Sequence, residues 1–274
     1  MIRRPPRSTL DRSSAASDVY KRQIQLRQIC LVAEKLDSVI DDLTAILGIK
    51  SCYVDPGVGA FGLENNLMPV GRNFLEVVAP IQENTAGGRY LERRGGDGGY
   101  MVITQVDDHK PRVERVKELG LRTVAYRDGE DYGLMQLHPK DTGGSFFEID
   151  EQRGDNAHAP DGPWHPAGPN WQRAKQTGRV SGICAAEIQC DDPESVGSRW
   201  SEIAQIRLQT NTLTLDNATI RFVECSDGRP EGLGGIDVIC RDFDSVLGAA
   251  RNLDAQTGEN QVMLCGLRIN FNGE

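Results

Sequence analysis

One pattern of apolar and polar residues occurs four times in this sequence, and this internal repeat restricts the possible fold more than any other feature. Each copy begins with an apolar, strand-like run, continues into a short amphipathic helix and ends in further strands. Asp readily caps the first backbone N–H groups of a helix, so the helices are expected to start near Asp37, Asp108, Asp192 and Asp244. Repeats of this length usually form stacked or paired units with a shared core. The pattern predicts four β-α-β-β-β units, of which the last two are abbreviated.

The strands that close the repeats share a second pattern, an apolar run that ends in an acid. The three acidic copies end in Glu76, Glu148 and Glu224, whereas the fourth copy, at residues 267–271, has no acid. A single Glu at the end of a strand is usually solvated. Because Glu76 and Glu148 occupy equivalent places in the first two repeats, we expect both to face one shared site.

A stretch rich in proline and glycine separates the second and third repeats and lacks apolar periodicity, which is typical of a linker. We therefore expect an α+β protein with two paired-module domains, residues 24–152 and 179–274, joined by a linker at 153–178. Residues 1–23 are rich in Arg, Ser and Pro and resemble translated adapter sequence. They are interpreted as a disordered tail or a sequencing artefact.

Composition excludes several classes of partner. The net charge of -9 and the pI near 5.1 disfavour nucleic acid and anionic membranes as partners. No apolar run approaches the roughly 18 residues that span a bilayer. The seven cysteines contain no CxxC pair and lie mostly in apolar runs, so we expect buried, reduced thiols and a cytoplasmic protein rather than a zinc site or disulfides.

Three segments resemble the vicinal oxygen chelate superfamily, which includes glyoxalases, bleomycin-resistance proteins and dioxygenases. Residues 28–32 resemble its opening strand, residues 90–103 the join between its modules, and residues 138–148 the end of its second module. The nearest resemblance is to epimerases that act on methylmalonyl-coenzyme A. It covers about residues 24–150 and implies paired β-α-β-β-β modules that form cupped mixed sheets with the active site on the concave face.

The resemblance also implies a divalent cation (Mg, Mn, Co, Ni or Zn) in the cup. Carried over by position, the ligands are Gln28, Glu76 and Glu148, and the fourth position is Met101. A thioether binds hard cations poorly, so the alternative is a cup without an ion. In that case the neighbouring carboxylates of Glu76 and Glu148 raise one pKa toward the range of general acid–base catalysis.

Three further residues are expected to contact substrate, namely Tyr100, Met101 and His138. For Tyr100 and Met101, packing within the cup is the competing interpretation. The second domain is expected to be degenerate at the positions that correspond to the ligand set, which we place at Ala185, Glu224, Gly235 and Phe271.

Together these features favour a glyoxalase-like small-molecule enzyme that acts on a carbonyl or on vicinal oxygens, as an isomerase, epimerase or lyase, with Glu148 and Glu76 as catalytic groups. A redox dioxygenase is disfavoured, because no histidine falls on a ligand position. The alternative is a non-catalytic protein of the same fold that sequesters a small molecule, and a third is a pseudoenzyme. A monomer and a homodimer are both compatible with four units in one chain.

Overall fold

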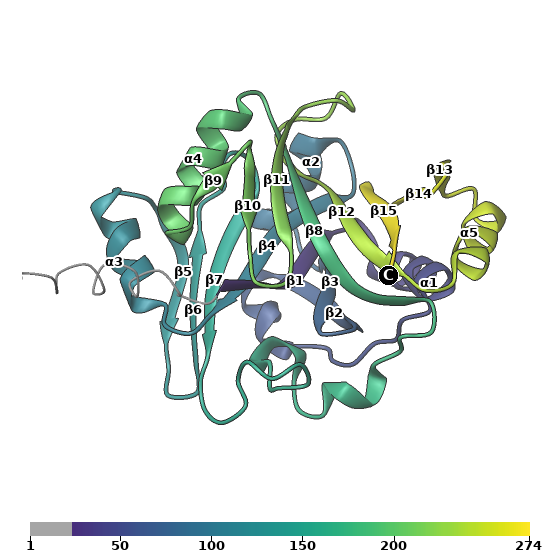
Figure 1. Ribbon diagram of the computed structural model, residues 1–274, viewed down its shortest axis with the longest axis horizontal. Helices are drawn as coiled ribbons and strands as arrows, with labels where there is room; N and C mark the ends of the chain where they lie inside the picture. The colour runs from purple at the N-terminus through teal and green to yellow at the C-terminus, as the bar shows by residue number, and fades with distance from the viewer. Residues whose placement is uncertain (1–23) are drawn as a thin grey trace, which may run out of the picture.

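The computed structural model describes residues 24–274, so the tail expected at 1–23 lies outside the described residues. Figure 1 shows two mixed β-sheets with helices around them. The strands of the first sheet are β1 (Ile24–Val32), β2 (Leu63–Val70), β3 (Asn73–Pro80), β4 (Gly98–Val106), β5 (Thr123–Asp128), β6 (Tyr132–Leu137) and β7 (Phe146–Gln152). Their order across the sheet is β2-β3-β1-β4-β7-β6-β5.

The second sheet is built in the same way from the later part of the chain. Its strands are β8 (Val180–Cys190), β9 (Leu208–Gln209), β10 (Thr212–Thr214), β11 (Thr219–Glu224), β12 (Gly232–Cys240), β13 (Gln256–Gly258), β14 (Gln261–Leu264) and β15 (Leu267–Gly273). Their order is β13-β14-β15-β12-β8-β11-β10-β9.

In every unit the closing strand lies parallel to the opening strand: β3 beside β1, β7 beside β4, β11 beside β8 and β15 beside β12. The two opening strands of each sheet pair antiparallel at its centre. This topology confirms the predicted α+β fold of paired β-α-β-β-β modules. The last two units are abbreviated as predicted, since their middle strands β9, β10, β13 and β14 have only two to four residues each. In the first unit Tyr53 forms only an isolated bridge to Leu67 where the other units have a strand.

Helices α1 (Leu36–Leu47), α3 (Lys110–Glu118), α4 (Pro193–Ala204) and α5 (Phe243–Asn252) begin close to the predicted acids. The predicted acidic caps are only partly correct. The carboxylate of Asp192 accepts the Ser195 N–H at 3.0 Å, and Asp242 rather than Asp244 caps α5. At α1 the cap residue is Lys35, without a side-chain bond. Helix α2 (Ala86–Arg94), which joins the first two units, was not predicted.

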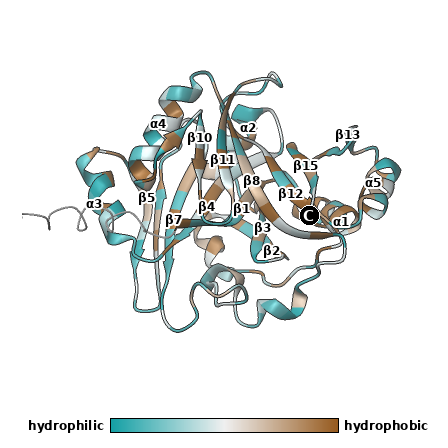
Figure 2. Ribbon diagram, viewed as in Figure 1, coloured by the Kyte–Doolittle hydropathy of each residue, from teal (hydrophilic) through white to brown (hydrophobic). Residues whose placement is uncertain are grey.

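The two sheets share one hydrophobic core. Ile29 and Val102 of the first sheet belong to the same buried cluster as Ile188 and Ile236 of the second. In Figure 2 the central strands carry apolar segments, whereas α3 is largely hydrophilic. Because side chains alternate across a strand, the residues that alternate with this core lie on the opposite face of the first sheet. That concave face therefore points away from the second sheet.

The segment at 153–178 is more than a spacer between the sheets. It contains two short 3-10 turns, η2 (His165–Ala167) and η3 (Trp171–Ala174), and it buries Trp164 and Trp171. The Arg27 guanidinium from β1 lies 5.5 Å from the Trp164 ring and 5.8 Å from the Trp171 ring. These cation–π contacts hold the segment against the concave face of the first sheet. None of the helices in residues 24–274 is long and apolar enough to cross a membrane.

Candidate active site

The concave face of the first sheet forms a cavity of about 340 Å³. Five of the six predicted site residues line it: Gln28, Glu76, Tyr100, Met101 and Glu148. Most of the other lining side chains are apolar, among them Val58, Phe61, Leu63, Val78, Ile103, Leu134 and Phe146. An apolar cavity with a few convergent polar groups is the usual form of a small-molecule site.

The strand register explains why these residues meet. Cys30 of β1 stands opposite Glu76 on one side and Met101 on the other, and Ile103 stands opposite Glu148. Parallel pairing of each closing strand with its opening strand brings the two glutamates to the same concave face. A β-bulge between Leu26 and Gln28 interrupts the regular pairing of β1 with β4 beside Gln28.

Glu76 is held by two buried amides. The Gln28 Nε2 donates to Glu76 Oε2 at 2.8 Å, and the Asn65 Nδ2 donates to Glu76 Oε1 at 2.6 Å. Burial raises the pKa of Glu76, while the hydrogen bonds from Asn65, Cys30 and Gln28 oppose that increase. Two amide donors stabilise the ionised form, so Glu76 has the better-supported carboxylate charge in the cup.

Glu148 has one amide donor, whereas Glu76 has two. The Gln136 Nε2 donates to Glu148 Oε2 at 2.9 Å and also lies 3.1 Å from the Met101 sulfur. Burial, with a smaller contribution from the Glu76 charge, raises the pKa of Glu148 to about 7, although hydrogen bonds with Asp150 and Gln136 oppose the increase. A buried carboxyl group that titrates near neutrality can accept a proton and return it, which is the property that general acid–base catalysis requires.

Asp150 lies two residues beyond Glu148 on the same face of β7 and extends the acidic row. It is fully buried, Tyr132 Oη donates to its Oδ2, and it shares a side-chain hydrogen bond with Glu148. Burial and the Glu148 charge raise the pKa of Asp150 well above its ordinary value. Asp150 was not predicted as a site residue, although its spacing of two from Glu148 on a strand places it on the same face.

Charged groups also stand at the mouth of the cavity. Arg127 of β5 lies 3.3 Å from His165 Nε2, measured from its Nη1, and both residues line the cavity with Asp55. His165 stacks on Tyr132 with ring centroids 4.8 Å apart. Burial and the Arg127 charge lower the pKa of His165, which favours the neutral ring. Arg127 has no carboxylate within ion-pairing distance in the described part of the chain, so its guanidinium charge is available to a ligand.

His138, the sixth predicted residue, lies outside this cavity. It follows β6 in a turn, where its Nδ1 accepts the Lys140 N–H at 3.2 Å. In this position the imidazole organises the turn and does not face the two glutamates.

The expected cation does not fit the donors of the cup. The amide nitrogens of Gln28 and Asn65 face Glu76, and the amide nitrogen of Gln136 faces Glu148 and Met101. The amide N–H groups therefore occupy the directions from which a cation would need oxygen ligands. Hard divalent cations prefer oxygen ligands. Within residues 24–274 no group of three or more His, Cys, Asp or Glu side chains could hold a metal ion.

The corresponding face of the second sheet carries a different set of residues. By strand register, Gln28, Glu76, Met101 and Glu148 correspond to Ala185, Arg221, Gly235 and Asn270. The assignments of Ala185 and Gly235 were correct, whereas those of Glu224 and Phe271 were wrong. Glu224 pairs with Cys190 at the end of β8, and Phe271 lies in the shared core. The sequences at the strand ends are similar in the two sheets, but their strand registers differ, and this difference led to the two wrong assignments.

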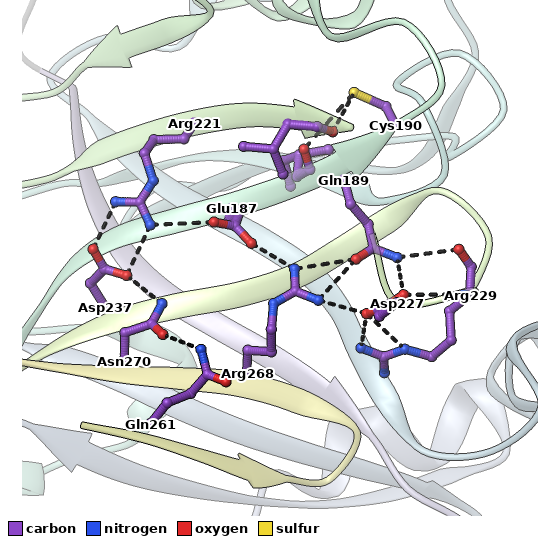
Figure 3. Close-up of polar contacts among 12 residues, drawn as sticks. Glu187, Gln189, Cys190, Arg221, Asp227, Arg229, Asp237, Gln261, Arg268 and Asn270 are labelled. Atoms are coloured by element: carbon purple, nitrogen blue, oxygen red, sulfur yellow. Dashed lines mark hydrogen bonds and ion pairs between the residues drawn. The ribbon is translucent and has the colours of Figure 1, made fainter. Parts of the chain in front are cut away.

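Figure 3 shows that ion pairs bridge this second face. Arg221 contacts both oxygens of Asp237 at 2.7 and 2.9 Å, and Arg268 contacts Glu187 and Asp227 at 2.6 Å each. Burial disfavours the charged form of Asp237, but hydrogen bonds from Arg221 and Asn270 keep its pKa below the ordinary value. The charges are mutually satisfied, so the second face has no acid with the properties of Glu148.

Comparisons with known proteins agree with the fold. No family model and no curated protein sequence matches this chain. A hypothetical protein from Staphylococcus aureus matches over 92% of this chain and 100% of its own, with a TM-score of 0.62 and 12% identity. Methylmalonyl-CoA epimerase from Mycobacterium tuberculosis matches over 49% of this chain and 91% of its own, with a TM-score of 0.42 and 24% identity.

The epimerase from Streptomyces coelicolor, in complex with 2-nitronate-propionyl-CoA, covers 47% of this chain and 98% of its own, with a TM-score of 0.42 and 19% identity. The topology of both sheets, together with the match to the Staphylococcus protein over nearly the whole chain, shows a fold of four β-α-β-β-β units in two pairs, which is the fold that the resemblance to the vicinal oxygen chelate superfamily implied.

Proposed function

We propose that the first-sheet cavity is the active site of an enzyme that moves a proton on a carbon next to a carbonyl group, as an isomerase, epimerase or lyase. One observation carries the proposal. Glu148 lies buried in an apolar cavity beside a second carboxylate, Glu76, and its pKa is raised to about 7. Two neighbouring carboxyl groups with different environments are a recurring basis for acid–base chemistry.

In the proposed reaction the Glu148 carboxylate removes the proton from the carbon. The C–H electron pair forms a carbon–carbon double bond, and the carbonyl electrons move to oxygen. The side-chain amide of Gln136 can donate its second N–H to that oxygen, because its other contact, the Met101 sulfur, is a weak acceptor. Arg127 at the mouth orients an anionic end of the substrate. Return of a proton by Glu148 to the same face of the carbon gives exchange. Epimerisation needs a proton on the opposite face, which Glu76 can deliver only from its protonated form, and burial of Glu76 favours that form.

The test is deuterium exchange followed by ¹H NMR in D₂O, with a panel of thioesters, β-keto acids and α-hydroxy ketones. We expect the wild-type protein to exchange the acidic C–H of at least one class, and Glu148→Gln to lower that rate by at least about 100-fold. Glu64→Gln is the matched control, because Glu64 is an exposed acid on the same sheet. Near-normal exchange by Glu148→Gln would contradict the assignment of the base.

The second candidate function is sequestration of a small molecule. It is favoured by the largely apolar cavity and by Phe61 and Val124, which line the cavity and remain 59% and 46% exposed. A binding protein would retain its ligand tightly without exchanging protons. Both functions suit the cytoplasm, since all seven cysteines are free thiols, as a reducing compartment favours.

A further inference from the structure

We infer that Trp164 is a positioning residue that fixes the orientation of the Gln28 amide and so makes the cup a site of hydrogen-bond donors rather than a cation site. The inference concerns the site proposed above, and it assigns a role to the segment between the two sheets. Proton transfer is not needed for its test, which measures metal binding without substrate.

The indole of Trp164 donates a hydrogen bond to Gln28. The Trp164 Nε1 lies 2.8 Å from Gln28 Oε1, and both residues are 1% exposed. An indole N–H is a donor only, so the atom of Gln28 that faces it must be the amide oxygen. If the amide were reversed, two N–H groups would face each other without water to separate them, which costs about 1–3 kcal/mol.

The fixed orientation of the Gln28 amide determines which of its groups faces Glu76. With its oxygen committed to Trp164, Gln28 presents its NH₂ group to Glu76 Oε2 at 2.8 Å. The other oxygen of Glu76 is occupied in the same manner. The Asp55 backbone N–H donates to Asn65 Oδ1 at 2.9 Å, which turns the Asn65 NH₂ group to Glu76 at 2.6 Å. The Gln28 oxygen, which a cation would need, points instead to the wall of the cavity.

Packing around the Trp164 ring keeps it in place beside Gln28. The Arg27 guanidinium lies 5.5 Å from its ring centroid, and Tyr132 packs edge-on at 5.8 Å. Each of these contacts comes from a buried residue of the first sheet. The segment at 153–178 therefore takes part in setting the chemistry of the cavity.

The experiment titrates the full-length, chelator-treated protein with Co²⁺ and Mn²⁺, by calorimetry and, for Co²⁺, by visible absorption. We expect no specific binding to the wild-type protein. Trp164→Phe frees the amide to turn its oxygen toward Glu76, and we expect at least a tenfold gain in Co²⁺ affinity. Gln28→Glu keeps Trp164 and adds an oxygen, so we expect a gain of the same sign and larger size.

Trp171→Phe is the matched control. Trp171 lies in the same segment, is also 1% exposed, and its indole donates to Gly162 O at 3.0 Å instead of Gln28. We expect this variant to bind no more Co²⁺ than the wild type. Folding of each variant is checked by circular dichroism, and Gln28→Glu decides the question if Trp164→Phe does not fold.

Three results overturn the inference. Stoichiometric Co²⁺ binding by the wild-type protein that is lost in Gln28→Ala would show that the Gln28 oxygen is a ligand. Equal Co²⁺ affinity of folded Trp164→Phe and Trp171→Phe would remove the role of Trp164. No gain in Gln28→Glu would show that the orientation of the Gln28 oxygen is not what keeps a cation out of the cup. Failure of the deuterium-exchange test would leave these metal results unchanged, so the two proposals fail separately.

Discussion

At the residue scale, the two glutamates of the cup differ in how the protein compensates their charge. Glu76 accepts hydrogen bonds from two side-chain amides, and Glu148 accepts one. Buried carboxylates lose the solvation of water, so the number of donors decides how readily each one ionises. Asn65 and Gln136 lie on the strands just before those of Glu76 and Glu148, whereas Gln28 comes from β1. The additional donor from β1 is what distinguishes the environment of Glu76 from that of Glu148.

The raised pKa of Glu148 has a consequence for stability. Its pKa is about 7 in the folded protein and 4.5 for an ordinary Glu, so the folded state binds this proton more tightly. Stability therefore falls as pH rises from about 4.5 through about 7. We expect Glu148→Gln, which carries no charge, to be more stable than wild type at pH 8 by about 3 kcal/mol and equal to it near pH 4.

Urea unfolding at the two pH values measures this difference, with Glu64→Gln as the exposed control. A stability difference between Glu148→Gln and wild type that does not change with pH would show that Glu148 keeps an ordinary pKa.

Sequence alone could predict some of these residues and not others. Glu76 and Glu148 could be predicted because each occupies the same position in the closing strand of its repeat. Trp164 carried no such signal, since it lies in a segment without periodicity and reaches Gln28 across 136 residues. Its role depends on tertiary packing that local sequence patterns do not encode.

At the scale of elements, turns set how closely the two sheets approach. Gly71, between β2 and β3, has φ of +63°, and a Cβ there would lie 1.8 Å from the Ser181 carbonyl oxygen. Both the positive φ and the contact exclude a side chain. Helices α1, α3, α4 and α5 were predicted because apolar stripes are local, although of the four predicted acids only Asp192 is the cap residue. Strand register in the second sheet was not predicted, because it depends on bulges such as that between Leu233 and Gly235.

The substitution Gly71→Ala tests this contact. We expect it to lower the free energy of unfolding by about 2–4 kcal/mol, since the backbone must shift and adopt a strained φ. Gly178→Ala is the control, because nothing lies within 4 Å of a Cβ at that position and its φ is not positive. Thermal melts of both variants measure the effect, and equal melting temperatures would contradict the close approach of the sheets.

At the scale of the whole molecule, the two sheets form one structural unit. Their convex faces share a core, and Trp200 of α4 stacks on Phe147 of β7 at 4.1 Å while its indole donates to Thr142 O at 2.8 Å. The sequence repeat predicted four units, but it did not show that the convex faces of the two sheets pack against each other. The faces that point away from this core therefore differ: that of the first sheet forms the cavity, and that of the second sheet carries ion pairs.

A shared core predicts that the chain unfolds in one cooperative transition. We expect tryptophan fluorescence, which reports Trp164, Trp171 and Trp200, and far-ultraviolet circular dichroism to give the same urea midpoint. Two separate midpoints would mean that the sheets are independent domains.

Titration of Glu148 by ¹³C NMR, with Glu148→Gln used to assign its carboxyl signal, measures the protonation of this group directly. We expect a midpoint near 7, because the carboxyl is buried beside Glu76. We also expect a lower midpoint in Glu76→Gln, which removes the neighbouring charge. A midpoint near 4.5 that does not respond to Glu76→Gln would contradict the claim that the two glutamates form a buried acid–base pair.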